Sequence, residues 1–189
     1  MLILASQSPR RKELLEKLHI PFAVRVADID EAMDPAKPPE EEVARVSREK
    51  ALAVPREEGD VVIAADTIVV LQGKALGKPH SPEEAVQMLT RLSGRDHQVM
   101  TGVTVLCGDK LLSHTEVTDI HFRDLSEKEI VRYVATGEPM DKAGAYGIQG
   151  GAALFVERMH GDYYNVMGLP VCRLWQMLGQ VAPDMLEDT

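Results

Sequence analysis

The order of apolar and polar positions along the chain predicts short strands and amphipathic helices that alternate with one another. Apolar runs and two-residue alternation predict strands over residues 2–5, 22–26, 61–70, 97–106, 111–123 and 153–159. Apolar residues at helical spacing predict helices over residues 9–18, 40–54, 82–92, 126–135 and 169–178. Turn sequences at residues 72–73 and 108–109 would close two antiparallel hairpins. The mixture predicts an α/β fold, with a mixed twisted sheet flanked by helices.

Length and composition set limits on this fold. A chain of 189 residues fits a single domain over residues 1–189, or two closely fused lobes. Hydrophobic residues make up 44% of the chain and charged residues 27%, as in an ordinary globular protein. Because aromatic residues are only 4%, the core must be built mainly from aliphatic side chains.

Charge and cysteine content narrow the function classes. The formal net charge of −9 would repel nucleic acid backbones and anionic lipid, although a local basic cluster could still bind a nucleotide. Cys107 and Cys172 belong to no CxxC pair, which disfavours a structural zinc site and favours a reducing compartment. The apolar N-terminal stretch is too short for a signal peptide, and no run approaches the ~20 apolar residues of a spanning helix. We therefore expect a cytoplasmic protein that binds neither nucleic acid nor membrane.

The first candidate site is the strand-to-helix turn at residues 6–11. Backbone amides at a helix N-terminus attract anions, and Ser8 is the expected N-cap. Arg10 and Arg11 stand in the first helical turn, where the helix dipole disfavours cations by roughly 0.3–1 kcal/mol each. A bound polyphosphate would reverse that sign, because amides, hydroxyls and guanidiniums would then face one anion. The alternative is a pair of solvated surface arginines.

The second candidate is Asp66, which interrupts the apolar run of residues 61–70. An unpaired carboxylate buried in such a run would be costly, and a metal ion or a cationic partner would remove the conflict. A carboxylate at the end of a strand is well placed to hold Mg²⁺ or to activate water. The alternative is a strand-end aspartate that accepts backbone hydrogen bonds.

Two lysines are candidates for holding phosphate. Lys50 falls between Val43 and Val46 on the apolar face of its helix. It could reach into a cleft to bind an anion, or it could extend past its apolar neighbours to the solvent. Lys78 follows the first hairpin and is a second candidate, with an ordinary surface lysine as the alternative.

A glycine-rich segment and an acidic run complete the candidate chemistry. Residues 142–151 contain four glycines, which let backbone approach a ligand closely. Gln149 offers both a donor and an acceptor, which suits the edge of a pyrimidine base, whereas the alternative is a plain mobile loop. Most of the acidic run at residues 28–34 is expected to be a solvated face, and one member could join Asp66 around a metal.

These places coincide with the motifs of a known family. The chain closely resembles the Maf family of nucleoside triphosphate pyrophosphatases from about residue 2 to residue 178. The motifs that carry the resemblance are Ser6-Gln7-Ser8-Pro9-Arg10-Arg11, Arg48-Glu49-Lys50-Ala51, Ala65-Asp66-Thr67, Gly77-Lys78-Pro79, Leu92-Ser93-Gly94, residues 141–150 and Val166-Met167-Gly168-Leu169-Pro170. Together they are far more specific than a lone glycine-rich loop.

The resemblance implies a fold, a reaction and a set of site residues. The fold is that of Maf and inosine-triphosphatase-like proteins, in which two lobes surround a cleft. The reaction is hydrolysis of the α–β phosphate bond with a divalent metal, Mg²⁺ or else Mn²⁺. The family's catalytic acid falls on Asp66, which would hold the metal together with Glu31. The implied phosphate contacts are Ser8, Arg10, Arg11, Lys50 and Lys78.

The family divides by substrate, and this chain is similar to the branch that prefers dTTP and UTP. Arg10, Thr67 and Gln149 occupy the three positions that separate this branch from the one that prefers 7-methyl-GTP. The resemblance therefore implies hydrolysis of dTTP, UTP and modified pyrimidine triphosphates to the monophosphate and pyrophosphate, in a house-cleaning role. The family name also carries a link to septum formation in bacterial division, which no residue of this sequence demonstrates.

Three alternatives accompany this interpretation. One is a 7-methyl-GTP or broad-specificity pyrophosphatase with the same chemistry. Another is a non-catalytic regulator of cell division that binds a nucleotide, although binding alone would not need the carboxylate of Asp66. A nucleic-acid-binding module is disfavoured by the net charge of −9 and the lack of a basic stripe. The sequence does not fix the oligomeric state, and a homodimer is compatible with it.

Overall fold

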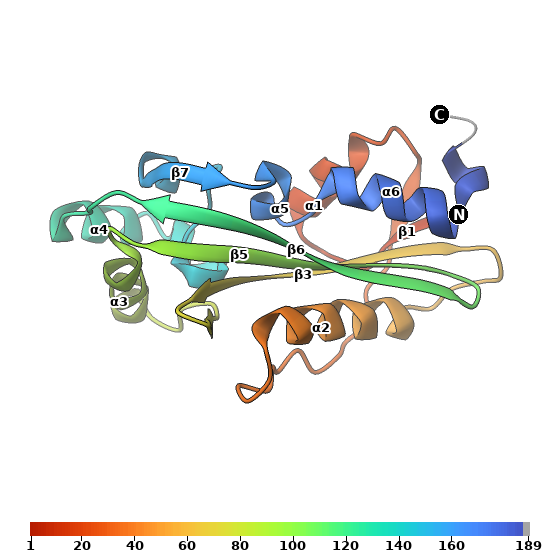
Figure 1. The fold of residues 1–189 in the computed structure, drawn as a ribbon, viewed down its shortest axis with the longest axis horizontal. Coiled ribbons are helices and arrows are strands. Elements are labelled where there is room, and N and C mark those ends of the chain that lie inside the picture. Colours follow the sequence, from red (N-terminus) through yellow and green to blue (C-terminus); the bar gives the residue numbers. More distant parts are fainter. Residues whose placement is uncertain (187–189) are drawn as a thin grey trace. The chain divides into compact units, whose positions relative to one another are not determined.

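The computed structural model describes residues 1–186, in which the strands form one mixed sheet of seven strands (Figure 1). The strands are β1 (Leu2–Leu4), β2 (Phe22–Val24), β3 (Val61–Leu71), β4 (Lys74–Leu76), β5 (Asp96–Cys107), β6 (Lys110–Phe122) and β7 (Val156–His160). Their order is β2-β1-β3-β5-β6-β7, with β4 paired to β3. β1 runs parallel to β2 and β3, whereas β4 and β7 run antiparallel to their neighbours. The predicted α/β class with a mixed sheet is confirmed.

Six α-helices and four short 3-10 segments connect the strands within the described residues. The α-helices are α1 (Pro9–Glu16), α2 (Pro39–Ala53), α3 (Pro82–Leu92), α4 (Glu127–Val134), α5 (Tyr163–Met167) and α6 (Val171–Val181). The 3-10 segments are η1 (Glu138–Asp141), η2 (Ala143–Ala145), η3 (Gly151–Leu154) and η4 (Pro183–Leu186). No helix within residues 1–186 is long and apolar enough to cross a membrane.

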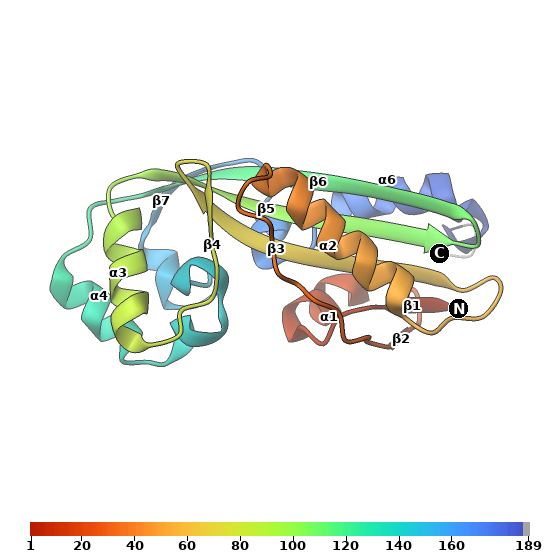
Figure 2. The ribbon, with the colours of Figure 1, turned by 90° about the horizontal axis from the view of Figure 1, so that it is seen from below.

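The chain divides into two compact units. Unit 1 comprises residues 1–66, 101–116 and those from 168 onward, and unit 2 comprises residues 67–100 and 117–167. In unit 1, α2 covers one face of the strands and α6 covers the other (Figures 1 and 2). The apolar core between α2 and the strands consists of Ile3, Ala5, Ala51, Val54, Val62, Ala64 and Leu106.

The position of α2 on the sheet depends on a close approach between its backbone and that of β5. A Cβ atom at Gly102 of β5 would collide with the carbonyl group of Val43 in α2, so only glycine fits there. One turn farther along α2, the hydroxyl groups of Ser47 and Thr104 are hydrogen-bonded at 2.8 Å. The rotation of α2 about its axis is thereby fixed, and with it the direction of every side chain on the helix.

In unit 2, the apolar core forms around Phe122, and α3 and α4 lie side by side next to it (Figure 2). The ring of Phe122 makes edge contacts with His97 and Tyr146, both at 4.8 Å between ring centroids, and with Phe155. Four of the eight aromatic residues, Phe122, Tyr133, Tyr146 and Phe155, thus pack together in the core of unit 2, whereas the buried core residues of unit 1 are aliphatic.

The structure corrects the sequence analysis at one important strand. β3 runs without a break from Val61 to Leu71, so Asp66 lies in the middle of a strand and not at a strand end. The carboxylate does not interrupt the strand because it accepts a hydrogen bond from Lys50, which satisfies its charge. Elsewhere, β7 begins later than predicted, because residues 151–154 form η3, and the five-residue α5 was not predicted.

Candidate active site

The centre of the candidate site is an ammonium group between two carboxylates. Nζ of Lys50 lies 2.8 Å from Oδ1 of Asp66 and 3.1 Å from Oε2 of Glu31. Lys50 is in the last turn of α2, Asp66 is in the middle of β3, and Glu31 is in the segment between β2 and α2. The side chains of Lys50 and Asp66 are only 13% and 15% exposed, whereas that of Glu31 is 58% exposed. Three separate parts of unit 1 thus meet at the ammonium group of Lys50, and this point is called the cation position below.

The packing of α2 explains why Lys50 points at this position. Val43, Val46 and Val54 are buried against the strands, and Lys50 shares their side of the helix as predicted. Its ammonium group donates to Asp66 and does not extend into solvent. Pairing with two carboxylates offsets the cost of holding the charge of Lys50 in a mostly buried place.

The turn between β1 and α1 is built around the hydroxyl group of Ser6. Oγ of Ser6 accepts hydrogen bonds from the backbone N–H of Ser8 at 3.2 Å and from Nη1 of Arg11 at 3.2 Å. Ser8 is the N-cap of α1, as predicted, and its side chain accepts from the backbone N–H of Arg11. The turn therefore folds back on itself and directs the guanidinium of Arg11 along the start of the helix.

Arg11 links this turn to the acidic pair of Glu31 and Asp66. Burial lowers the pKa of the Arg11 guanidinium, and the negative charges of Asp66 and Glu31 act in the opposite direction. The positive charge of Arg10 lowers that pKa further, so both arginines belong to the same electrostatic cluster. A guanidinium stays charged in proteins, and the cluster therefore combines two arginines and a lysine with two carboxylates.

Two groups that hold Arg11 were not identified as site residues from the sequence. One is the hydroxyl group of Ser6, and the other is the carbonyl oxygen of Gly168, which accepts from Nε of Arg11 at 2.8 Å. Gly168 has a φ of 116°, a backbone conformation that glycine adopts far more readily than other residues. Its place in one of the motifs of the family resemblance was a signal, but that signal did not show what the carbonyl group contacts.

The remaining predicted residues belong to unit 2. Thr67 follows Asp66 directly in β3, Lys78 is exposed in the segment after β4, and Gln149 is exposed between η2 and η3. The geometry of unit 1 therefore brings together Ser8, Arg10, Arg11, Glu31, Lys50 and Asp66. The roles of all the predicted site residues, Thr67, Lys78 and Gln149 included, stay predictions.

The donor set of Asp66 and Glu31 fits a hard divalent cation. Among residues 1–186, no three or more His, Cys, Asp or Glu side chains form a group that could hold a metal by themselves. The two carboxylates nevertheless present oxygen atoms to one point, where the ammonium of Lys50 now acts as the cation. Mg²⁺ is commonly bound by one or two carboxylates together with water and substrate phosphates, without an all-protein cage. Asp66 and Glu31 could therefore hold a metal ion whose remaining ligands are water and the phosphate oxygens of a substrate.

Comparison with known proteins gives consistent results. The protein-family model described as Maf-like protein matches residues 1–181. A curated relative named dTTP/UTP pyrophosphatase from Symbiobacterium thermophilum is 55% identical over 180 residues, which cover 95% of this chain and 93% of the relative. A protein of the same name from Bacillus velezensis is 51% identical over 178 residues, which cover 94% of each chain. Among solved structures, a HAM1 protein from Coxiella burnetii is similar in fold, with a TM-score of 0.50, 14% identity, and coverage of 95% of this chain and 98% of that one.

Proposed function

We propose, because the chain belongs to the Maf family, that it hydrolyses nucleoside triphosphates, with dTTP and UTP favoured, to the monophosphate and pyrophosphate. Curated relatives that are more than half identical over nearly their whole length are named dTTP/UTP pyrophosphatases. The observation that carries the proposal is the convergence of Asp66, Glu31 and Lys50 on one point, within electrostatic reach of Arg11. Enzymatic hydrolysis of a phosphoanhydride uses two kinds of group. One is a carboxylate beside the attacking water, and the other is a set of cations around the phosphates.

The cations of this cluster are the proposed phosphate contacts. Ser6 and Gly168 hold the guanidinium of Arg11, so little rotamer freedom remains to be lost when it binds phosphate oxygens. Ser8 and the backbone N–H of Arg10 are proposed to face the same anion, because a helix N-terminus favours negative charge. Arg10, Lys50 and Lys78 complete the set and neutralise the charge that develops on the leaving pyrophosphate.

Asp66 and Glu31 are the proposed ligands of a divalent metal, Mg²⁺ in preference and Mn²⁺ as a substitute. When bound, such a metal supplies charge neutralisation to the phosphate oxygens and lowers the pKa of coordinated water. Asp66 takes the proton of the attacking water. Its place in the middle of β3 supports this role, because a strand flanked by buried neighbours holds the carboxylate in a fixed position.

Three residues are the proposed contacts of the base. Gln149 offers a donor and an acceptor to a pyrimidine edge, Thr67 stands next to Asp66, and Arg10 is the third position that distinguishes the substrate branches. We place the activity in the cytoplasm, where both cysteines, which are free in the structure, would stay reduced. Modified pyrimidine triphosphates are included among the substrates.

A substrate panel tests the proposal. The purified protein is incubated with Mg²⁺ and each of dTTP, UTP, CTP, dCTP, ATP, GTP and 7-methyl-GTP, and the products are separated by chromatography. We expect monophosphate and pyrophosphate from dTTP and UTP, and loss of the reaction when EDTA removes the metal. Diphosphate and inorganic phosphate as products would contradict the assignment of the cleaved bond.

Two other outcomes would redirect the proposal. Activity confined to 7-methyl-GTP would keep the chemistry and overturn the roles given to Arg10, Thr67 and Gln149. Binding of nucleotide without turnover of any triphosphate would favour a non-catalytic regulator.

A further inference from the structure

The segment that carries Glu31 has no regular structure of its own. Residues 25–38, between β2 and α2, form neither helix nor strand. Glu31 is 58% exposed, and its carboxylate is nevertheless 3.1 Å from Nζ of Lys50. An exposed side chain on an irregular segment has many accessible rotamers, and the segment itself has many accessible backbone conformations. Something other than Glu31 must therefore hold the segment in place.

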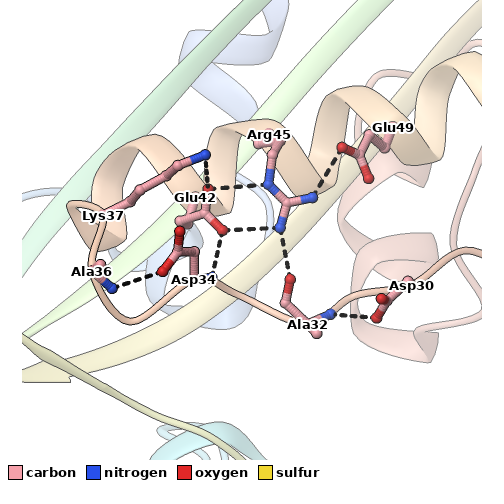
Figure 3. Close-up of polar contacts among 8 residues, drawn as sticks. All are labelled: Asp30, Ala32, Asp34, Ala36, Lys37, Glu42, Arg45 and Glu49. Carbon is pink, nitrogen blue, oxygen red and sulfur yellow. Dashed lines mark hydrogen bonds and ion pairs between the residues drawn. The ribbon is translucent and has the colours of Figure 1, made fainter.

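An ion pair on α2 provides this attachment (Figure 3). Nη2 of Arg45 donates to the carbonyl oxygen of Ala32 at 2.7 Å and to Oε2 of Glu42 at 3.0 Å. Nε of Arg45 donates to the other carboxylate oxygen of Glu42 at 3.1 Å. Oε2 of Glu42 in turn accepts from the backbone N–H of Asp34 at 2.8 Å. The backbone is thus tied to α2 at residues 32 and 34, and residue 32 directly follows Glu31.

The ion pair has the properties of a rigid anchor. Glu42 is only 2% exposed, and both of its oxygens are engaged by the planar guanidinium of Arg45. The hydrogen bonds from Arg45, and then that from the amide of Asp34, lower the pKa of Glu42 to about 2, so the carboxylate is ionised at neutral pH. Lys37, at 4.0 Å from Oε1, adds a second cation. Because the side chain of Glu42 is buried and that of Arg45 is only 26% exposed, this ion pair holds its geometry more firmly than a fully exposed pair does.

Stabilisation of α2 alone does not account for these contacts. A carboxylate in the first turn of a helix interacts well with the helix dipole, and Arg45 also pairs with Glu49 one turn later at 2.9 Å. Neither effect requires a bond to the preceding segment. The bonds to the carbonyl group of Ala32 and the amide of Asp34 are the part of the network that reaches Glu31.

We propose that Glu42 and Arg45 are positioning residues of the active site, which hold residues 32 and 34 in place so that Glu31 faces Asp66 across the cation position. The proposal rests on the proposed function, because there Glu31 and Asp66 are the ligands of the divalent metal. Glu42 and Arg45 themselves contact neither substrate nor metal. Their effect is to keep Glu31 near its binding geometry before the ligand arrives, which lowers the entropic cost of binding.

The test compares metal binding by the variants Arg45→Gln, Glu31→Gln and the double variant. Mn²⁺ is titrated into each protein in the presence of a non-hydrolysable triphosphate analogue, and free Mn²⁺ is measured by electron paramagnetic resonance. For Arg45→Gln we expect the Kd of Mn²⁺ to rise on the order of tenfold. The Mg²⁺ concentration for half-maximal turnover should rise in parallel, with little change in kcat at saturating Mg²⁺.

The double variant separates positioning from general destabilisation. If Arg45 acts through Glu31, adding Arg45→Gln to Glu31→Gln should not weaken Mn²⁺ binding further. Additive losses would overturn the proposal, and so would an Arg45→Gln variant that binds Mn²⁺ as the wild-type protein does. Should Arg45→Gln fail to fold, Glu42→Gln, which keeps the side-chain shape and removes the charge, gives the same comparison.

Two matched controls accompany these variants. Glu49→Gln removes the Arg45–Glu49 pair but leaves the bond to Ala32, and it should leave the Kd of Mn²⁺ unchanged. Arg25→Gln removes another arginine of unit 1 that donates to a backbone carbonyl, that of Pro55 at 3.1 Å, and it should also have no effect. Failure of the proposed function would appear as a wild-type protein without turnover. Failure of this inference leaves the wild type active, with Arg45→Gln either equal to the wild type in Mn²⁺ binding or additive with Glu31→Gln.

Discussion

At the scale of single residues, the site consists of opposite charges that neutralise one another at short range. Lys50 pairs with Asp66 at 2.8 Å and with Glu31 at 3.1 Å, and the guanidinium of Arg11 is within electrostatic reach of both carboxylates. Each of these groups would be costly to bury alone. Because the charges depend on one another, a substitution at one position changes the surroundings of the others.

Asp66→Asn is the most direct test of this cluster, because the amide keeps the shape of the side chain and removes its charge. Loss of a general base typically slows a reaction by about 10²–10⁴-fold, and we expect a loss of dTTP turnover in that range. The control is Asp109→Asn, in the exposed turn between β5 and β6, which should keep wild-type turnover. If Asp66→Asn keeps most of the activity, Asp66 is not the general base.

A second prediction at this scale concerns His97 and the dependence of stability on pH. His97 is 3% exposed and is hydrogen-bonded to the hydroxyl group of Tyr146 at 2.8 Å. Burial lowers its pKa from 6.5 to about 4. Between these values the unfolded chain binds a proton that the folded protein does not, so stability falls as the pH falls from 6.5 towards 4.

The loss should reach on the order of 3 kcal/mol at pH 4, since one pKa unit corresponds to about 1.4 kcal/mol. Urea denaturation at pH 7, 5.5 and 4 measures this loss for the wild-type protein and for His97→Gln. The variant should show a shallower decline over the same interval. Equal declines in the two proteins would assign the acid sensitivity to other groups.

At the scale of elements, the segments that carry proposed site residues are held by side chains from neighbouring helices. In unit 1 this is the attachment of residues 32 and 34 to α2. In unit 2, the hydroxyl group of Tyr133 in α4 donates to Glu138 at 2.8 Å and accepts from the amide of Gly147 at 3.2 Å. The carboxylate of Glu138 also accepts from the amide of Gly151 at 3.2 Å. The backbone on both sides of Gln149 is thereby fixed.

Tyr133→Phe is therefore expected to weaken recognition of the base. The variant keeps the ring that packs against Phe155 and removes the hydroxyl group that bonds to the Gln149 segment. We expect KM for dTTP and UTP to rise about fivefold, which corresponds to about 1 kcal/mol of binding free energy lost when the bond to Gly147 no longer holds this segment, with a smaller change in kcat. Tyr164→Phe, at an exposed position of α5, should leave both constants unchanged. A drop in kcat alone would argue against a role in binding the base.

The elements also show how far the sequence could predict the structure. Local signals located five of the six α-helices in the described residues, and the position of Lys50 on the apolar face of its helix followed from spacing alone. The continuity of β3 through Asp66 was missed, because the partner that satisfies this carboxylate is 16 residues away in another element. The bond from Arg11 to Gly168 spans 157 residues. Contacts of this kind form when separate elements pack against one another. Local periodicity describes each element by itself and does not show which elements will meet.

At the scale of the whole molecule, the chain passes between the two units four times. Unit 1 contains three segments of the chain, and β3, β5 and β6 each contribute residues to both units. The removal of one unit would therefore leave the other with interrupted strands. We expect the two units to unfold together in one cooperative transition.

The distribution of aromatic residues makes this expectation measurable. The single tryptophan, Trp175, is in unit 1, and the four tyrosines, Tyr133, Tyr146, Tyr163 and Tyr164, are all in unit 2. Tryptophan fluorescence and tyrosine absorbance thus report on different units during urea denaturation. Their midpoints should coincide. Two separate midpoints would show that the units unfold independently.

The position of Lys50 has a consequence for the balance between activity and stability. Active sites often lower the stability of a protein, because they gather like charges that repel one another until a ligand arrives. Here the ammonium of Lys50 acts as a built-in counterion for Asp66 and Glu31. The empty protein therefore carries its acidic pair without unbalanced repulsion, and natural selection can keep both carboxylates without weakening the fold around them.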